Sequence, residues 1–154
     1  MWYPLRQENT PGNHHMATLS INADLTQLVT VRRFVAQAAR DLGMDEQGIY
    51  ELQLAVDEAC TNVIRHGYGG RDGKIEIHIE PGEGGLLLMV RDWGSAFDPQ
   101  AVPTPDVTIS LEERGLGGLG LFLMRQVTDD LCFEFDAEKG NTLTMVKRLP
   151  EGGE

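Results

Sequence analysis

A long amphipathic segment of the chain ends with the sequence Glu58-Ala59-Cys60-Thr61-Asn62-Val63-Ile64-Arg65-His66-Gly67-Tyr68. Further along, an apolar run closes with Asp92-Trp93-Gly94-Ser95-Ala96-Phe97-Asp98-Pro99. A third motif then opens a predicted helix: Gly115-Leu116-Gly117-Gly118-Leu119-Gly120-Leu121. These motifs supply a carboxylate and an amide on one helix face, an acid at a strand end and a glycine loop at a helix start. Such a set of groups is suited to holding a nucleoside triphosphate and its metal ion.

The first motif offers a possible catalytic pair. Glu58 and Asn62 lie four residues apart, so a helix places both side chains on one face. An Asn oxygen is a good neutral ligand for Mg²⁺, and a Glu one turn away can orient or deprotonate a nucleophile near a phosphate. Taken alone, the same spacing is also common on solvated helix faces.

The second motif places an acid at the end of a predicted buried strand. A buried Asp92 needs a hydrogen-bond partner, and the amino group of adenine donates a suitable bond. Gly94 would let the base approach the backbone, and Trp93 would either stack on the base or pack in the protein. The alternative for Asp92 is an ordinary turn residue.

The glycine motif exposes backbone N–H groups at the start of a helix, where phosphate binds readily. It lacks the Lys and Ser/Thr of a Walker loop and does not follow a strand as a Rossmann loop does. Thr142, at the start of the last predicted strand, could give its hydroxyl to the base. Each of these two features is weak evidence by itself.

The hydrophobic pattern predicts a small α/β domain, an α+β two-layer sandwich with about three helices on one face of a mixed, mostly antiparallel sheet. Residues 1–17 are expected to form a flexible leader, residues 18–150 the domain and residues 151–154 a tail. Residues 98–114 show little regular pattern and predict a long loop or lid. The predicted strands are 18–22, 74–80, 86–90, 131–135 and 142–149, and the predicted helices are 24–42, 45–65 and 117–128.

Composition narrows the class of protein. The formal net charge of -11 argues against a general nucleic-acid binder, which needs a basic face. The sequence has no apolar run near the roughly 20 residues of a membrane helix, and its start does not resemble a secretory signal. The two cysteines are far apart, which predicts reduced thiols. We therefore expect a cytoplasmic protein that binds neither nucleic acid nor membranes directly.

In their order and spacing, the three motifs resemble those of the anti-sigma-factor serine kinases, a branch of the histidine-kinase-like (Bergerat) ATPase superfamily. The resemblance covers about Leu19 to Leu149. The motif at 58–68 is similar to the family's N box, the motif at 92–99 to its G1 box and the motif at 115–121 to its G2 box. Gly140-Asn141-Thr142 is similar to the last adenine-side motif. The resemblance implies a Bergerat ATP-binding fold, with ATP and Mg²⁺ as cofactors.

The resemblance also implies residue roles. Glu58 would be the general base for a substrate serine and Asn62 the Mg²⁺ ligand, while Asp92 would bind the adenine amino group. The segment 103–114 would form the lid. The implied nucleotide-binding positions are Asn62, Arg65, His66, Asp92, Gly94, Ala96, Phe97, Gly115, Leu116, Gly117, Gly118, Gly120, Leu121 and Thr142.

The implied function is that of an anti-sigma factor in a partner-switching module. Such a protein binds a sigma factor and phosphorylates an anti-anti-sigma (STAS-type) protein on serine, and the family is usually dimeric. The alternative is a non-catalytic nucleotide-binding module that sequesters a protein partner. The sequence shows no phosphoacceptor-histidine helix pair ahead of the domain, so a two-component histidine kinase is disfavoured. A gyrase or an Hsp90-type chaperone is disfavoured because the chain has no room for a transducer domain.

Overall fold

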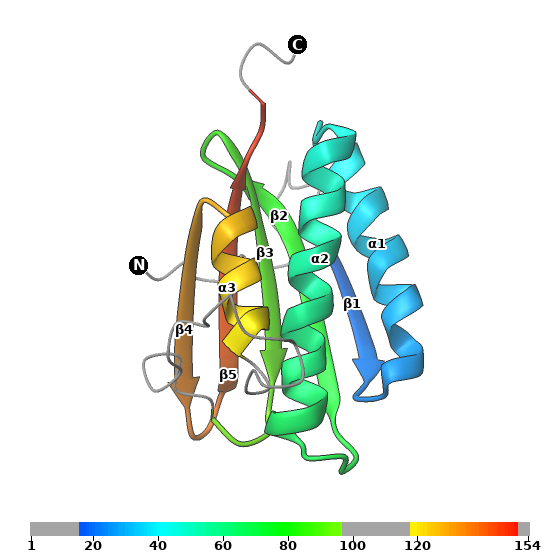
Figure 1. Ribbon diagram of the computed structural model, residues 1–154, viewed down its shortest axis with the longest axis vertical. Helices are drawn as coiled ribbons and strands as arrows, with labels where there is room; N and C mark the ends of the chain where they lie inside the picture. The colour runs from blue at the N-terminus through cyan, green and yellow to red at the C-terminus, as the bar shows by residue number, and fades with distance from the viewer. Residues whose placement is uncertain (1–15, 97–117, 151–154) are drawn as a thin grey trace.

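The computed structural model describes residues 16–96 and 118–150 of the chain. These residues form two layers, with a five-stranded sheet behind and the helices packed on one of its faces (Figure 1). The predicted α/β sandwich is therefore confirmed. No helix in the described residues has the length and apolar character needed to cross a membrane.

The sheet consists of β1 (Ala17–Asn22), β2 (Lys74–Gly82), β3 (Gly85–Asp92), β4 (Asp130–Asp136) and β5 (Gly140–Arg148). Their order is β1-β2-β3-β5-β4, and every neighbouring pair is antiparallel. The mixed sheet that the sequence predicts thus contains no parallel pair among these strands. Tight turns join β2 to β3 and β4 to β5, and short connections of this kind allow only antiparallel pairing.

The helical layer contains α1 (Leu28–Asp41), α2 (Glu46–Asn62) and α3 (Gly118–Val127), which confirms the three predicted helices. A 3₁₀ turn, η1 (Leu25–Gln27), precedes α1, and the Asp24 carboxylate accepts a hydrogen bond from the N–H of Thr26 there. Asp45 caps α2 by accepting from the N–H of Gly48 at 2.9 Å. Both aspartates therefore act as N-caps of the helical segments that follow them.

The end of α2 departs from the predicted continuous helix. From Val63 the backbone widens into a π-helical turn, η2 (Val63–Gly67). The N–H of Tyr68 closes this turn by donating to the carbonyl of Val63 at 2.8 Å. Single π turns are uncommon and occur often at functional sites.

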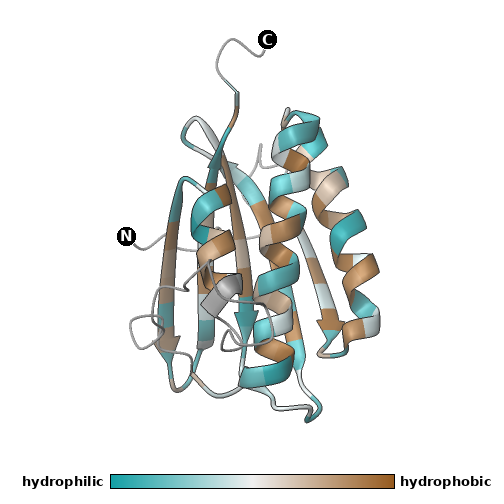
Figure 2. Cartoon of the chain, in the orientation of Figure 1, coloured by the Kyte–Doolittle hydropathy of each residue, from teal (hydrophilic) through white to brown (hydrophobic). Residues whose placement is uncertain are grey.

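The core lies between the two layers. The inward positions of β2 and β3 alternate with outward ones and face the apolar stripes of α1 and α2 (Figure 2). The thiol of Cys60 is buried here in α2, and burial raises its pKa to about 12. The main core residues are Val31, Val35, Ala39, Ile49, Leu52, Val56, Ala59, Ile75, Ile77, Ile79, Leu86, Leu88 and Val90.

Tyr68 connects three elements at the end of the molecule where β3 finishes. Its hydroxyl donates to the carbonyl of Lys74 in β2 at 2.6 Å and accepts from the N–H of Trp93 after β3 at 2.9 Å. The side chain is only 6% exposed, and its ring packs directly on Gly73, where a side chain would collide with it. Tyr68 therefore fixes η2 against the ends of β2 and β3.

We predict that Tyr68→Phe destabilises the fold by about 1–3 kcal/mol, because two buried backbone groups lose their partner. Denaturant unfolding measures this change. Tyr50→Phe is the matched control. Tyr50 is 58% exposed, so the loss of its hydroxyl should leave stability unchanged. Equal stability of the two variants would show that the Tyr68 hydroxyl does not hold these elements together.

Candidate functional site

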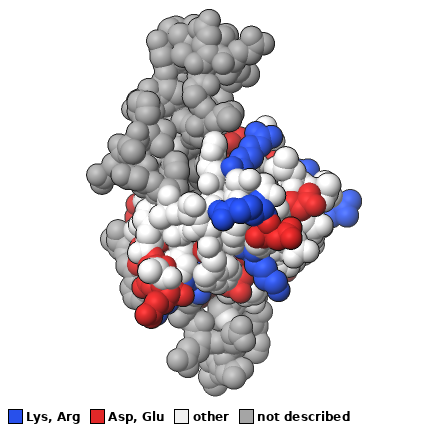
Figure 3. All heavy atoms as spheres, turned by 90° about the horizontal axis from the view of Figure 1, so that it is seen from below, with Lys and Arg blue, Asp and Glu red and all other residues white. Residues whose placement is uncertain are grey.

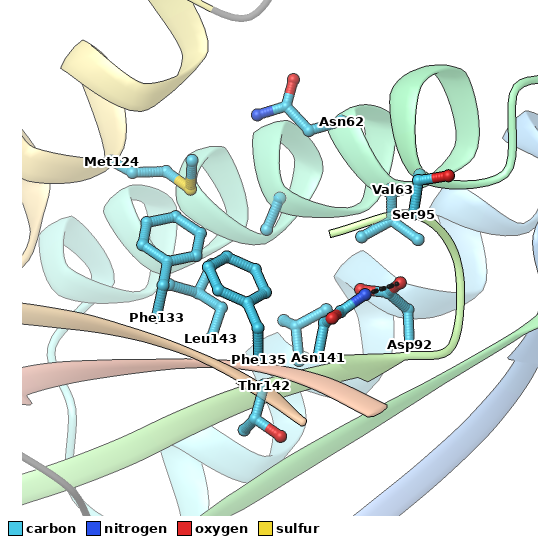
Figure 4. Close-up of a pocket in the computed structure, with 13 residues that line it drawn as sticks. Asn62, Val63, Asp92, Ser95, Met124, Phe133, Phe135, Asn141, Thr142 and Leu143 are labelled. Carbon is cyan, nitrogen blue, oxygen red and sulfur yellow. Dashed lines mark hydrogen bonds between the residues drawn. The ribbon is translucent and has the colours of Figure 1, made fainter. Parts of the chain in front are cut away.

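A pocket opens between the sheet and the helices at the end where α2 and β3 finish and β5 begins (Figures 1 and 4). Strand residues form its floor, α2 and α3 form its roof, and polar side chains gather at one end. The lining residues are Ala59, Asn62, Val63, Gly67, Val90, Asp92, Ser95, Met124, Phe133, Phe135, Asn141, Thr142 and Leu143. The apolar walls with a few polar groups are typical of a site for a planar organic ligand.

Asp92 is the buried acid of this pocket, with 6% of its surface exposed. Its Oδ1 accepts hydrogen bonds from the N–H of Gly94 at 2.8 Å and from Nδ2 of Asn141 at 3.1 Å. Burial raises the pKa of the carboxyl, while these two hydrogen bonds lower it. Both donors contact Oδ1, and within the described residues none contacts Oδ2. The second oxygen is therefore available to accept a hydrogen bond from a ligand.

Gly94 is required for a close contact between two backbone segments. The N–H of Ser95 donates to the carbonyl of Gly67 at 2.7 Å. A Cβ on Gly94 would lie 2.6 Å from the carbonyl carbon and oxygen of Gly67, so a larger residue cannot occupy this position without displacing η2. Gly94 therefore has a structural role against η2, and the approach of a base to its backbone stays a prediction.

Glu58 and Asn62 lie on the face of α2 that meets the start of α3. A Cβ on Gly120 would lie 2.6 Å from Oε2 of Glu58 and 3.6 Å from Nδ2 of Asn62, so both side chains adjoin the α3 backbone. Burial raises the pKa of the half-buried Glu58, the negative charge of Asp57 raises it further, and the positive charge of Arg65 lowers it. Asn62 offers a neutral oxygen that suits Mg²⁺, and Glu58, one turn away, offers a carboxylate that can accept a proton.

Two ionic contacts position the helices around Glu58. Nη1 of Arg32 in α1 lies 3.0 Å from both carboxylate oxygens of Asp57, next to Glu58 in α2. Nζ of Lys147 in β5 lies 2.6 Å from Oε1 of Glu51 and 2.6 Å from the carbonyl of Val127, the last residue of α3. Lys147 therefore joins α2, α3 and the sheet.

Thr142 lines the pocket, but its hydroxyl bonds to another strand residue. Thr142 pairs with Arg91 across β5 and β3, and its hydroxyl accepts from Nε of Arg91 at 3.3 Å. Asn141 is the residue that pairs with Asp92. Because successive strand residues point to opposite faces, the hydroxyl of Thr142 points away from the pocket (Figure 4). Asn141 occupies the position next to Asp92 in its stead.

The remaining predicted nucleotide-binding residues range from exposed to buried. Arg65 and His66 are exposed on η2, and Ala96 is exposed beyond β3. Leu121 is 2% exposed and packs in the core, so its side chain is not available to a ligand. Gly118 begins α3. Outside the described residues lie Phe97, Gly115, Leu116, Gly117 and the predicted lid.

The predicted site residues do not include Asn141 or the two aromatic residues of β4. Phe133 and Phe135 both line the pocket, with ring centroids 6.2 Å apart and planes inclined by 15°. Knowledge of the β3–β5 register would have placed Asn141 opposite Asp92. The alternation of Phe133 and Phe135 in β4 would likewise have placed both rings on one face.

Charged residues of both signs surround the pocket end of the molecule. Figure 3 views this end directly and shows Lys and Arg side chains beside Asp and Glu on the described surface. Arg65, Arg71 and Lys74 are exposed here. The overall charge of -11 therefore does not make this end uniformly acidic.

Comparison with known proteins identifies one family model and a set of related kinases. The family model for the histidine kinase-like ATPase domain matches residues 21–147. The serine-protein kinase RsbW of Bacillus pumilus (strain SAFR-032) is 33% identical over 126 residues, which cover 77% of this chain and 76% of that protein. The serine-protein kinase RsbW of Listeria monocytogenes serovar 1/2a is 32% identical over 143 residues, which cover 90% of each chain.

We predict that Gly120→Ala disturbs Glu58 while leaving the fold intact, because the new methyl group meets a mobile carboxylate oxygen and not the backbone. Thermal unfolding should be little changed. The NMR titration of the Glu58 carboxyl should shift, since its surroundings change. Gln126→Ala, on the exposed part of α3, is the control and should leave the titration as in the original protein. An unchanged Glu58 titration in Gly120→Ala would show that the two groups are not in contact.

Proposed function

The chain belongs to the histidine kinase-like ATPase family, and its relatives include the serine-protein kinases RsbW. On this premise we propose that it transfers the γ-phosphoryl group of ATP to a serine of a partner protein. One observation carries the proposal: Asp92 and Asn62 line the same pocket, and Glu58 lies beside Asn62 next to the start of α3. The Asp92 carboxylate suits a nucleotide base, and the Glu58–Asn62 pair suits a metal-bound phosphate.

The pocket supports binding of the adenine ring. Apolar side chains above and below the cavity provide the surfaces that a flat ring needs, and Asp92 Oδ2 can accept from the 6-amino group. The triphosphate would then extend toward Asn62 and the start of α3, where the free N–H groups of a helix favour anions. Asn62 would hold Mg²⁺, which supplies charge neutralisation for the phosphates.

Glu58 would act as the general base. The serine hydroxyl proton passes to the Glu58 carboxylate, while the serine oxygen forms a bond to the γ-phosphorus. The bond from the γ-phosphorus to the bridging oxygen breaks, and ADP leaves with the electron pair. The raised pKa of Glu58 brings this carboxylate closer to the range in which a base works well near neutral pH.

The partners we propose are those of an anti-sigma factor: a sigma factor that the protein sequesters, and an anti-anti-sigma (STAS-type) protein that it phosphorylates. The names of the relatives support the serine kinase part of this role. The negative net charge suits docking on basic surfaces of protein partners. We propose a homodimer as the working form and the cytoplasm as its location.

We predict that Glu58→Ala abolishes transfer of radiolabel from ATP to a cognate anti-anti-sigma protein, with little change in the Kd for ATP. Transfer depends on the base, whereas the adenine contacts are at the other end of the pocket. Undiminished transfer in this variant would reject Glu58 as the base. Partner binding without transfer in the original protein would instead favour the non-catalytic alternative.

The pH profile gives a second prediction. Glu58 accepts a proton only when ionised, so the transfer rate should fall as the pH drops through its pKa, which lies above the usual 4.5. Asp57→Asn should move this acidic limb to lower pH, because the Asp57 charge raises the pKa of Glu58. Arg65→Gln should move it to higher pH, because Arg65 lowers that pKa. Limbs that coincide in all three proteins would contradict the assignment.

A further inference from the structure

We propose that Asn141 determines base selectivity: its side-chain amide fixes the Asp92 carboxylate so that the pocket accepts a 6-aminopurine nucleotide and rejects a 6-oxopurine nucleotide. This inference rests on the proposed nucleotide-binding function. Asn141 belongs to the Gly140-Asn141-Thr142 motif, in which the sequence gives the ligand contact to Thr142, but the Thr142 hydroxyl points to the other side of the sheet.

The amide of Asn141 is fully committed as a donor. Asn141 lies directly opposite Asp92 in the β3–β5 ladder. Its Nδ2 donates to Oδ1 of Asp92 at 3.1 Å and to the carbonyl of Gly94 at 3.0 Å. Both partners are acceptors, so the nitrogen and not the oxygen must face them. The two amide hydrogens are thereby used within the protein, and none remains to donate to a base.

The same contacts determine what Asp92 can do. Oδ1 accepts from Asn141 Nδ2 and from the N–H of Gly94, which holds the carboxylate plane and leaves Oδ2 for the ligand. Burial raises the pKa of Asp92, and the two donors oppose part of that rise because they favour the ionised carboxylate. Ionised Asp92 has no proton to donate, so it can accept from an amino group but cannot donate to a carbonyl.

The chemistry of the base then follows. The 6-amino group of adenine donates hydrogen bonds, whereas the 6-oxo group of hypoxanthine or guanine only accepts them. A 6-oxo group opposite Oδ2 would place two acceptors together in a half-enclosed pocket, which costs the hydrogen bond and leaves the carboxylate unpaired. Without Asn141, Asp92 has one donor fewer, takes up a proton more readily, and can then donate to that carbonyl.

The experiment measures Kd for Mg–ATP and Mg–ITP by calorimetry in the original protein and in Asn141→Leu. Leu keeps much of the volume and removes the amide. We expect the original protein to prefer ATP, and the ATP-to-ITP preference to fall by about tenfold or more in the variant. ATP affinity in the variant should also fall as the pH is lowered over a range in which the original protein is unaffected.

Two further variants separate selectivity from folding. Thr144→Val alters the same strand on the face away from the pocket and should leave both affinities unchanged. Asn141→Ser keeps one hydroxyl donor and should recover part of the selectivity, and it serves as the test if Asn141→Leu fails to fold. An unchanged ATP-to-ITP ratio in a folded Asn141 variant would overturn the inference alone. Failure of the original protein to bind either nucleotide would overturn the proposed function and the inference with it.

Discussion

The buried carboxylate of Asp92 is the constraint on which this end of the molecule depends. An acid that is 6% exposed at the end of a strand must be paired, and the N–H of Gly94 and the amide of Asn141 provide that pairing. The first partner requires the chain to turn immediately after β3. The second requires β5 to lie beside β3 in the observed register. The fold and the site thus share the same hydrogen bonds.

A second set of contacts brings the helices to this acid. The π turn η2 places the Gly67 backbone against Gly94, and Tyr68 ties the turn to β2 and to the segment after β3. Glu58 and Asn62, one or more turns earlier in α2, are thereby set at a fixed position relative to Asp92. On the other side, Lys147 anchors the end of α3, whose first turn adjoins Glu58.

Much of this arrangement is predictable from the sequence, because it follows from the spacing of apolar residues and from the residues that begin and end helices and strands. The caps Asp24 and Asp45, the apolar stripes and the alternation of β2 all have local causes, and Asp92 at a strand end indicates a ligand site. The π turn, the Gly67–Gly94 contact and the choice of Asn141 over Thr142 depend on how distant segments meet. A one-residue difference in the register of β5 against β3 reverses which side chain faces the pocket, and no local pattern specifies that register.

The central claim is that Asp92 anchors a nucleotide in this pocket, and calorimetric titration of Mg–ATP into the original protein and Asp92→Asn tests it most directly. The account predicts binding by the original protein and an affinity lower by about tenfold or more in the variant, because the amide is a weaker acceptor and brings an unmatched donor. Thermal unfolding of both proteins checks that the variant is folded. No binding by the original protein at about 1 mM ATP, or equal affinity in both proteins, would contradict the account.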